Sequence, residues 1–200
     1  MTTTSVMAEP AFPNYVYTGR IELNQIQIDT VIEEILNLQL YQYNWGKSGW
    51  NSDHNEAWFW NSVPNIKKVA PLIVRELHGG LVNQNGWPSE DRVFETKNGK
   101  FYLEARRCFP VIIYPGHDFP LNKNAYYSGI TILRCSDRSH RPYIQCTEHG
   151  VVDRDPIRCW YPEVNQQIFV PGNIHWGISS GNDDTATIAL VSHIFRNKVI

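Results

Sequence analysis

Short apolar segments separated by turn residues fill the chain from about Lys100 onward, and they restrict it to a mainly β fold. The segments are KFYLEARR, FPVIIYP, SGITILRC, RPYIQC, QQIFVPG and TATIALVSHIF, with Gly, Pro, Asn and Asp between them. Evenly spaced short strands of this kind are typical of antiparallel barrels and sandwiches. We therefore expect an α+β, mainly β protein with a jelly-roll or barrel-like core over about 100–196, supported by N-terminal helices.

The first of these helices is expected at about 29–40, in the segment DTVIEEILNLQL. Its apolar residues recur at helical spacing, and the side chains of Thr30 and Glu33 can form a capping box at its start.

A second helix is expected at about 63–78, in SVPNIKKVAPLIVRELHGG. Pro71 should kink this helix or split it after Ala70, because proline removes a helical hydrogen bond. Gly79 or Gly80 should end it.

The overall composition indicates one soluble domain. The chain has 200 residues, 42% of them hydrophobic, and a net charge of −2, which gives no electrostatic reason to expect a nucleic acid or membrane partner. We expect 1–15 to be a loose lead-in and 16–200 to be a single domain. The absence of a signal-like start or a long apolar run predicts a cytoplasmic protein with reduced cysteines, although Cys135 and Cys146 could pair across neighbouring strands.

The last β segment, TATIALVSHIF, has two different faces. One face carries small polar groups and an imidazole (Thr185, Thr187, Ala189, Val191, His193), which suits a barrel interior that holds a polar ligand. The other face is apolar and suits packing against the helices. Alternatively, Thr185 and Thr187 face solvent at the start of the strand.

His175 follows a Pro-Gly turn at the end of an apolar segment, in FVPGNIHWG. Such a turn can present an imidazole at the mouth of a barrel for metal binding or proton transfer. The simpler alternative is a histidine hydrogen-bonded in a loop beside Trp176.

The segments YPGHDFPLNKNAYYSGITIL and IFVPGNIHWGISSGNDDTATIALVSHIF together resemble the Fe(II)- and 2-oxoglutarate-dependent oxygenases, whose core is a cupin-like double-stranded β-helix. The resemblance covers about 111–195 and is greatest to prolyl-hydroxylase-type and related small phage and bacterial members. It implies a facial triad of two histidines and one carboxylate that binds Fe(II), with a basic residue that anchors 2-oxoglutarate.

Carried onto this chain, the resemblance implies an altered site. Gly116 matches the turn glycine, and His175 matches the second metal-binding histidine. The His-x-Asp pair falls on Asn122 and Asn124, and the basic anchor falls on Thr185 or Thr187. Neutral amides are weak ligands for Fe(II), and a threonine cannot neutralise a dicarboxylate, so the favoured interpretation has no metal.

Three hypotheses follow for a small-molecule or peptide substrate. The first is an enzyme that catalyses isomerisation, epimerisation or cyclisation by acid–base chemistry, without metal or 2-oxoglutarate. The second is a true oxygenase whose metal is held by an offset triad, His117, Asp118 and His175, which requires a bulged strand. The third is a binding protein that retains only the fold. The candidate catalytic residues are His175, His117, Asn122, Asn124 and His193; the candidate substrate-binding residues are Tyr126, Thr185, Thr187, Trp176, Trp58, Trp60 and Arg107.

Overall fold

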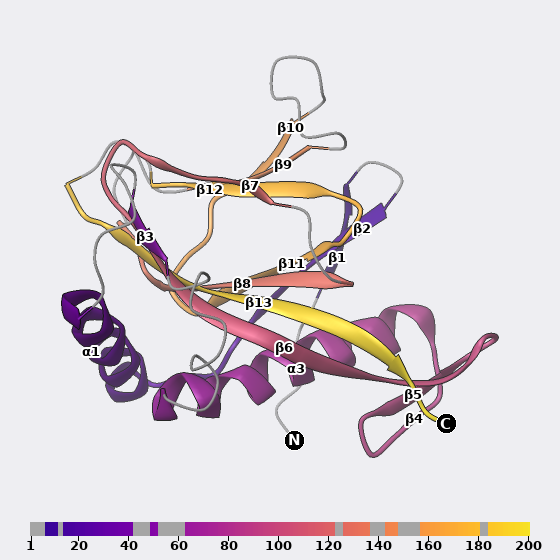
Figure 1. Ribbon diagram of the computed structural model, residues 1–200. Helices are drawn as coiled ribbons and strands as arrows, with labels where there is room; N and C mark the ends of the chain where they lie inside the picture. Colours follow the sequence, from indigo (N-terminus) through magenta and orange to yellow (C-terminus); the bar gives the residue numbers. More distant parts are fainter. Residues whose placement is uncertain are drawn as a thin grey trace.

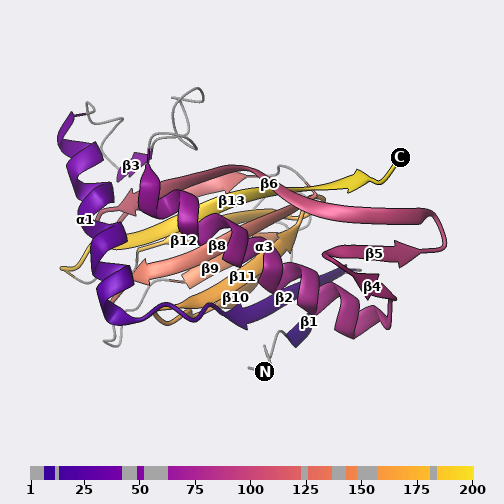
Figure 2. The same ribbon diagram turned by 90° about the horizontal axis from the view of Figure 1, so that it is seen from below.

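Two antiparallel sheets face each other and two helices cover the outer side of the larger sheet in the computed structural model (Figure 1). The structure describes residues 7–11, 14–41, 49–51, 63–122, 126–136, 143–147, 157–180 and 184–200. The helices are α1 (Gln25–Tyr41) and α3 (Pro64–Asn85). Figure 2 shows α3 running along the strands of the larger sheet and α1 at one end of it.

The larger sheet has the order β1-β2-β11-β8-β13-β6-β5-β4, with β3 also paired to β6. Its strands are β1 (Met7–Ala11), β2 (Asn14–Arg20), β3 (Gly49–Asn51), β4 (Ser89–Glu90), β5 (Val93–Thr96), β6 (Gly99–Ile113), β8 (Tyr127–Arg134), β11 (Gln166–Pro171) and β13 (Thr187–Lys198). The smaller sheet has the order β10-β9-β12-β7, formed by β7 (Asp118–Asn122), β9 (Tyr143–Thr147), β10 (Ile157–Trp160) and β12 (His175–Ser179).

From β6 onward the chain passes back and forth between the two sheets, as in a jelly roll. The expected fold class is therefore confirmed: a mainly β double-stranded β-helix core with supporting helices. The single domain over 16–200 stays a prediction. All four cysteines are free thiols, as the composition favoured.

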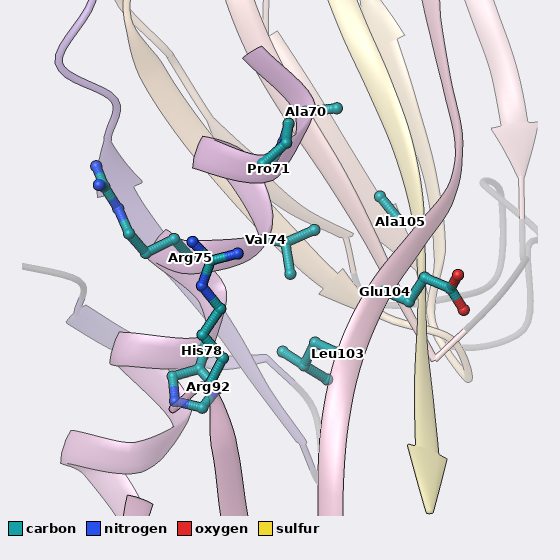
Figure 3. Close-up of a pocket in the computed structure, with 9 residues that line it drawn as sticks. All are labelled: Ala70, Pro71, Val74, Arg75, His78, Arg92, Leu103, Glu104 and Ala105. Carbon is teal, nitrogen blue, oxygen red and sulfur yellow. The ribbon is translucent and has the colours of Figure 1, made fainter. Parts of the chain in front are cut away.

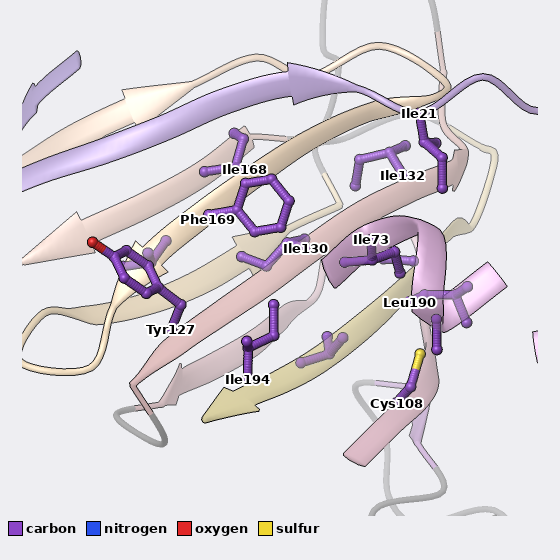
Figure 4. Close-up of a cluster of buried hydrophobic side chains, with 14 of the residues drawn as sticks. Ile21, Ile73, Cys108, Tyr127, Ile130, Ile132, Ile168, Phe169, Leu190 and Ile194 are labelled. Atoms are coloured by element: carbon purple, nitrogen blue, oxygen red, sulfur yellow. The ribbon is translucent and has the colours of Figure 1, made fainter. Parts of the chain in front are cut away.

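Gly129 shows which side of the larger sheet faces the helices. A Cβ added to Gly129 would lie 3.3 Å from Ile73 of α3, so this position of β8 points toward the helix. Ser192 of β13 lies directly opposite Gly129, and opposite residues of an antiparallel pair share a face. Consistent with this, Ser192 bonds to Cys108, which lies with Ile73 and Leu190 in the apolar cluster of Figure 4.

Because side chains alternate along a strand, the neighbours of these residues point into the space between the sheets. The face of β13 that begins at Thr187 and ends at His193 is thus the inner face, as the sequence predicted. Thr185 is the exception: it precedes the strand and is exposed.

The start of α1 differs from the prediction. The helix begins at Gln25, not near 29, because Asn24 and Gln27 form the cap: the Gln27 N–H donates to Asn24 Oδ1 at 2.9 Å, and the Asn24 N–H donates to Gln27 Oε1 at 2.9 Å. Thr30 lies inside the helix, where its hydroxyl donates to the Ile26 carbonyl at 2.7 Å. The predicted Thr30 cap is therefore wrong.

The second helix is longer than predicted. Pro71 neither splits nor ends α3; it is exposed, and the helix continues to Asn85. Packing of the helix against the larger sheet offsets the loss of one hydrogen bond. Gly79 and Gly80 lie within the helix, and Gly86 ends it in the left-handed conformation, with φ 62°.

Two strand predictions also need correction. Part of the expected loose lead-in, 1–15, forms a hairpin in which β1 pairs with β2 at the edge of the larger sheet. The segments KFYLEARR and FPVIIYP form one continuous strand, β6, because β13 pairs along almost its entire length. Neither described helix is long and apolar enough to span a membrane.

Candidate active site at one end of the barrel

The candidate residues fall at two opposite ends of the barrel. At one end, here called the His193 end, β7 finishes at Asn122, β12 begins at His175 and β13 carries His193. At the other, the Thr187 end, β7 begins at Asp118, β12 finishes at Ser179 and β13 begins at Thr187. The antiparallel pairing of β7 with β12 sets this arrangement (Figure 1).

Three polar residues form a row across the inner face at the His193 end. Arg107 of β6 lies opposite His193 of β13, and His193 lies opposite Ser128 of β8. Directly opposite residues have Cβ atoms about 5 Å apart, so these side chains are immediate neighbours. We call Arg107, His193 and Ser128 the polar row.

The polar row is well packed. His193 is 5% exposed and meets the Phe109 ring edge-on, with the ring centroids 5.4 Å apart. Ser128 is also buried, whereas Arg107 is half-buried. Of the three residues of the row, Arg107 is the one that meets solvent.

A β-bulge places a second arginine beside the row. His193 pairs with Arg107 and the next residue, Ile194, pairs with Ala105, so Arg106 is the extra residue of β6. The Arg106 guanidinium lies 4.7 Å from the centroid of the Phe195 ring and donates to Asn197 Oδ1 at 2.8 Å. This end of the barrel therefore combines positive charge, an imidazole and an aromatic ring.

His175 lies at the rim of the barrel, and its side chain is turned away from the barrel interior. Strand alternation puts His175 and Trp176 on opposite faces of β12. Trp176 is 1% exposed and stacks on Phe119, whereas Asp118, which lies on the face of His175, is exposed. The strand thus points Trp176 inward and leaves His175 half-buried at the rim, where its Nδ1 is buried without a hydrogen-bond partner.

Other residues singled out from the sequence also belong to the His193 end. The Cα of Asn122 lies opposite that of Trp176, the residue that follows His175. Tyr126 donates its N–H to the Ile194 carbonyl at 2.9 Å, and the Arg196 guanidinium lies 4.7 Å from its ring centroid. Asn124, Trp58 and Trp60 lie outside the described residues.

The offset metal triad is excluded by the register of the strands. Asp118 pairs with Ser179, which lies four residues beyond His175 on β12. At about 3.3 Å per residue, Asp118 and His175 are about 13 Å apart, whereas ligands of one metal ion converge within a few ångströms. His117 is exposed and tied through its backbone to Ser180. Within the described part of the chain, no three His, Cys, Asp or Glu side chains form a group that could hold a metal.

The residue at the position that the resemblance implies for the 2-oxoglutarate anchor is uncharged. Thr187 is completely buried at the Thr187 end, and its Oγ1 has no hydrogen-bond partner. Thr187 itself has no positive charge that could pair with a buried dicarboxylate, although Arg134 of β8 lies opposite the next residue, Ile188. The described residues therefore do not fit Fe(II) and 2-oxoglutarate at the positions that the resemblance implies.

Nothing in the sequence singled out Ser128, and the sequence indicated Arg107 only as a candidate substrate-binding residue. Alternation along TATIALVSHIF was enough to place His193 inside the barrel. The neighbours of His193 depend on pairing with β6 and β8, which lie about 65 to 85 residues away in the chain.

Comparison with known proteins supports the fold. The sequence matches no protein-family model and no curated protein. Several solved structures do match. One is HygX from Streptomyces hygroscopicus, with nickel and 2-oxoglutarate bound (TM-score 0.60, 6% sequence identity, covering 92% of this chain and 83% of that one). Another is the non-heme α-ketoglutarate-dependent epimerase SnoN from nogalamycin biosynthesis (TM-score 0.58, 8% identity, 90% and 77%). A third is a prolyl-4-hydroxylase from Pseudomonas putida (TM-score 0.54, 9% identity, 88% and 90%).

Identities this low carry the fold and not the activity. The agreement extends over most of each chain. The chain therefore has the double-stranded β-helix fold of the 2-oxoglutarate-dependent oxygenases.

Proposed function

We propose that this protein is an enzyme that catalyses proton transfer on a small molecule or peptide side chain, without Fe(II) or 2-oxoglutarate. The reaction would be an isomerisation, an epimerisation or a cyclisation, and the substrate would carry an acidic group. The polar row is the observation that carries this proposal, because it puts a cation, an imidazole and a hydroxyl side by side on the inner face of the barrel.

Each member of the row has a role in this scheme. Arg107 would bind the anionic group of the substrate through a charge-assisted hydrogen bond and so fix its orientation. His193 would remove a proton from the substrate and return it at a different position or on the opposite face. Ser128, directly opposite His193, would hold the imidazole in place.

The altered metal position supports the same proposal. Asp118 is too far from His175 to share a metal with it, and an amide residue stands at Asn122. The similarity to SnoN adds that an epimerase can be built on this fold, although SnoN itself is described as α-ketoglutarate-dependent. A functional oxygenase and a binding protein that retains only the fold are the alternatives that the experiment must separate.

The test follows proton exchange directly. Protein treated with a chelator is incubated in D2O with a panel of small carboxylic acids that bear an acidic C–H bond, and deuterium incorporation is followed by NMR. We expect exchange without added iron or 2-oxoglutarate, and a loss of about 100-fold or more in His193→Gln. Arg107→Gln should raise KM more than it lowers kcat, because it removes binding of the anionic group.

His117→Gln is the matched control, since His117 is exposed at the opposite end of the barrel. It should exchange protons at the wild-type rate. Exchange that appears only with Fe(II) and 2-oxoglutarate would favour the oxygenase. Saturable binding of a panel member without exchange would favour a binding protein.

A further inference from the structure

A pocket on the helix side of the larger sheet has the composition of an organic-anion site. It has a volume of about 230 Å³ and lies between α3 and β6, on the opposite side of the sheet from the polar row. Ala70 and Val74 of α3 and Leu103 of β6 form an apolar wall (Figure 3). The pocket is smaller than the roughly 300–1,000 Å³ typical of drug-sized ligands, so its occupant must be small.

Three nitrogen-bearing side chains gather on the α3 side of this pocket. They are Arg75, His78 and Arg92. Figure 3 shows the Arg92 guanidinium beside Val74, whereas the Arg75 side chain extends outward from α3 and the Glu104 carboxylate points away on the β6 side. Burial and the charge of Arg92 lower the pKa of His78, so the imidazole is neutral near pH 7. The positive charge of the pocket therefore comes from the two arginines.

The carboxylates nearby do not neutralise both arginines. Glu104 accepts hydrogen bonds from Asn197 Nδ2 at 2.9 Å and Arg106 Nε at 3.4 Å, outside the arginine cluster. Glu76 lies 3.6 Å from the Arg75 guanidinium. Among the described residues, no hydrogen bond or ion pair engages Arg92.

The backbone at Arg92 gives a second, independent indication. Asp91 and Arg92 form the two-residue turn of the β4–β5 hairpin, with φ angles of 47° and 67°. Glycine is favoured at the second position of such a turn, because side chains there are strained. A long cationic side chain held in this conformation, at the edge of a pocket, suggests a role in binding.

We propose that this pocket binds a small organic carboxylate with an apolar body. The carboxylate would pair with the guanidinium group of Arg92, the nearby Arg75 would add positive charge, and the apolar body would rest against Ala70, Val74 and Leu103. This site is distinct from the polar row, and its occupation does not depend on the function proposed there.

Benzoate is a suitable probe because it combines a carboxylate with a compact apolar ring. Binding is followed by amide chemical shifts on isotope-labelled full-length protein at about pH 7. We expect saturable binding in the millimolar range, with shifts in α3, the β4–β5 turn and β6. Benzamide and inorganic phosphate should each bind at least about tenfold more weakly, since each lacks one of the two features.

Arg92→Gly tests the arginine directly and relieves the strained turn, so the variant is expected to fold. It should weaken benzoate binding at least about tenfold, and Arg75→Gln should weaken it to a smaller extent, while Arg158→Gln, an exposed arginine of β10, should leave it unchanged. The absence of saturable benzoate binding would overturn the proposal. Equal binding of benzamide or phosphate, or wild-type affinity in Arg92→Gly, would also overturn it.

Discussion

Replacing Gly129 with alanine tests which face of the larger sheet packs against the helices. The polar row lies on the inner face only if Gly129 points toward the helices. A Cβ at this position would lie 3.1 and 3.2 Å from two atoms of the Phe169 ring and 3.3 Å from Ile73. Both neighbours are completely buried, so neither can move aside freely. Overpacking of this kind costs about 1–3 kcal/mol. For a chain of 200 residues, this corresponds to a fall in Tm of roughly 2 to 12 °C.

The assay is reversible thermal or urea unfolding of Gly129→Ala beside a matched control, Gly79→Ala. Gly79 lies within α3, and a Cβ there would have no neighbour within 4 Å. Alanine is the better helix former, so the control should be up to about 1 kcal/mol more stable than the wild type. If Gly129→Ala were as stable as the wild type, Gly129 would not face α3. His193 and Ser128 would then point away from the barrel interior, and the polar row would not form.

Two further substitutions test residues with a buried side-chain oxygen that has no hydrogen-bond partner. Thr187→Val should raise the free energy of unfolding by about 1 kcal/mol in urea unfolding, because the Oγ1 of Thr187 is buried without a hydrogen bond; a loss of stability would mean that the hydroxyl has a partner. Burial raises the pKa of Glu76 more than Arg75 lowers it, so the folded state holds this proton more tightly than the unfolded state. This contribution favours folding below the ordinary glutamate pKa and is lost as the pH rises through the raised value. Glu76→Gln should therefore raise the free energy of unfolding at pH 7. It should also reduce the decline of that free energy above about pH 4.5, measured by urea unfolding at a series of pH values. A less stable variant at pH 7 would show that the charged carboxylate is favourable there.

The fold could be predicted from local patterns because the strands and turns of the C-terminal half have strong sequence signals. The helix boundaries were harder, because more than one residue could act as the cap. Asn24 with Gln27 and Thr30 with Glu33 both fit the capping pattern, and only the structure shows that the earlier pair is used. Pro71 was expected to break α3, but tertiary packing outweighs the local penalty.

The candidate site was less predictable because it depends on strand register. The sequence correctly placed His193 inside the barrel, since alternation along one strand needs no long-range information. The direction of the His175 side chain could not be predicted in the same way, because it depends on which face of β12 Trp176 occupies. The pairing of β7 with β12 likewise decides that Asp118 cannot join His175, a result that no local motif contains.

Calorimetric titration of the chelator-treated protein with Fe(II) and 2-oxoglutarate under anaerobic conditions tests the central claim most directly. The described residues lack a converging ligand set and a positive anchor at Thr187. We therefore predict no stoichiometric binding of iron at micromolar concentrations, with or without 2-oxoglutarate. A one-to-one complex with a micromolar Kd, tightened by 2-oxoglutarate, would contradict the account and restore the oxygenase.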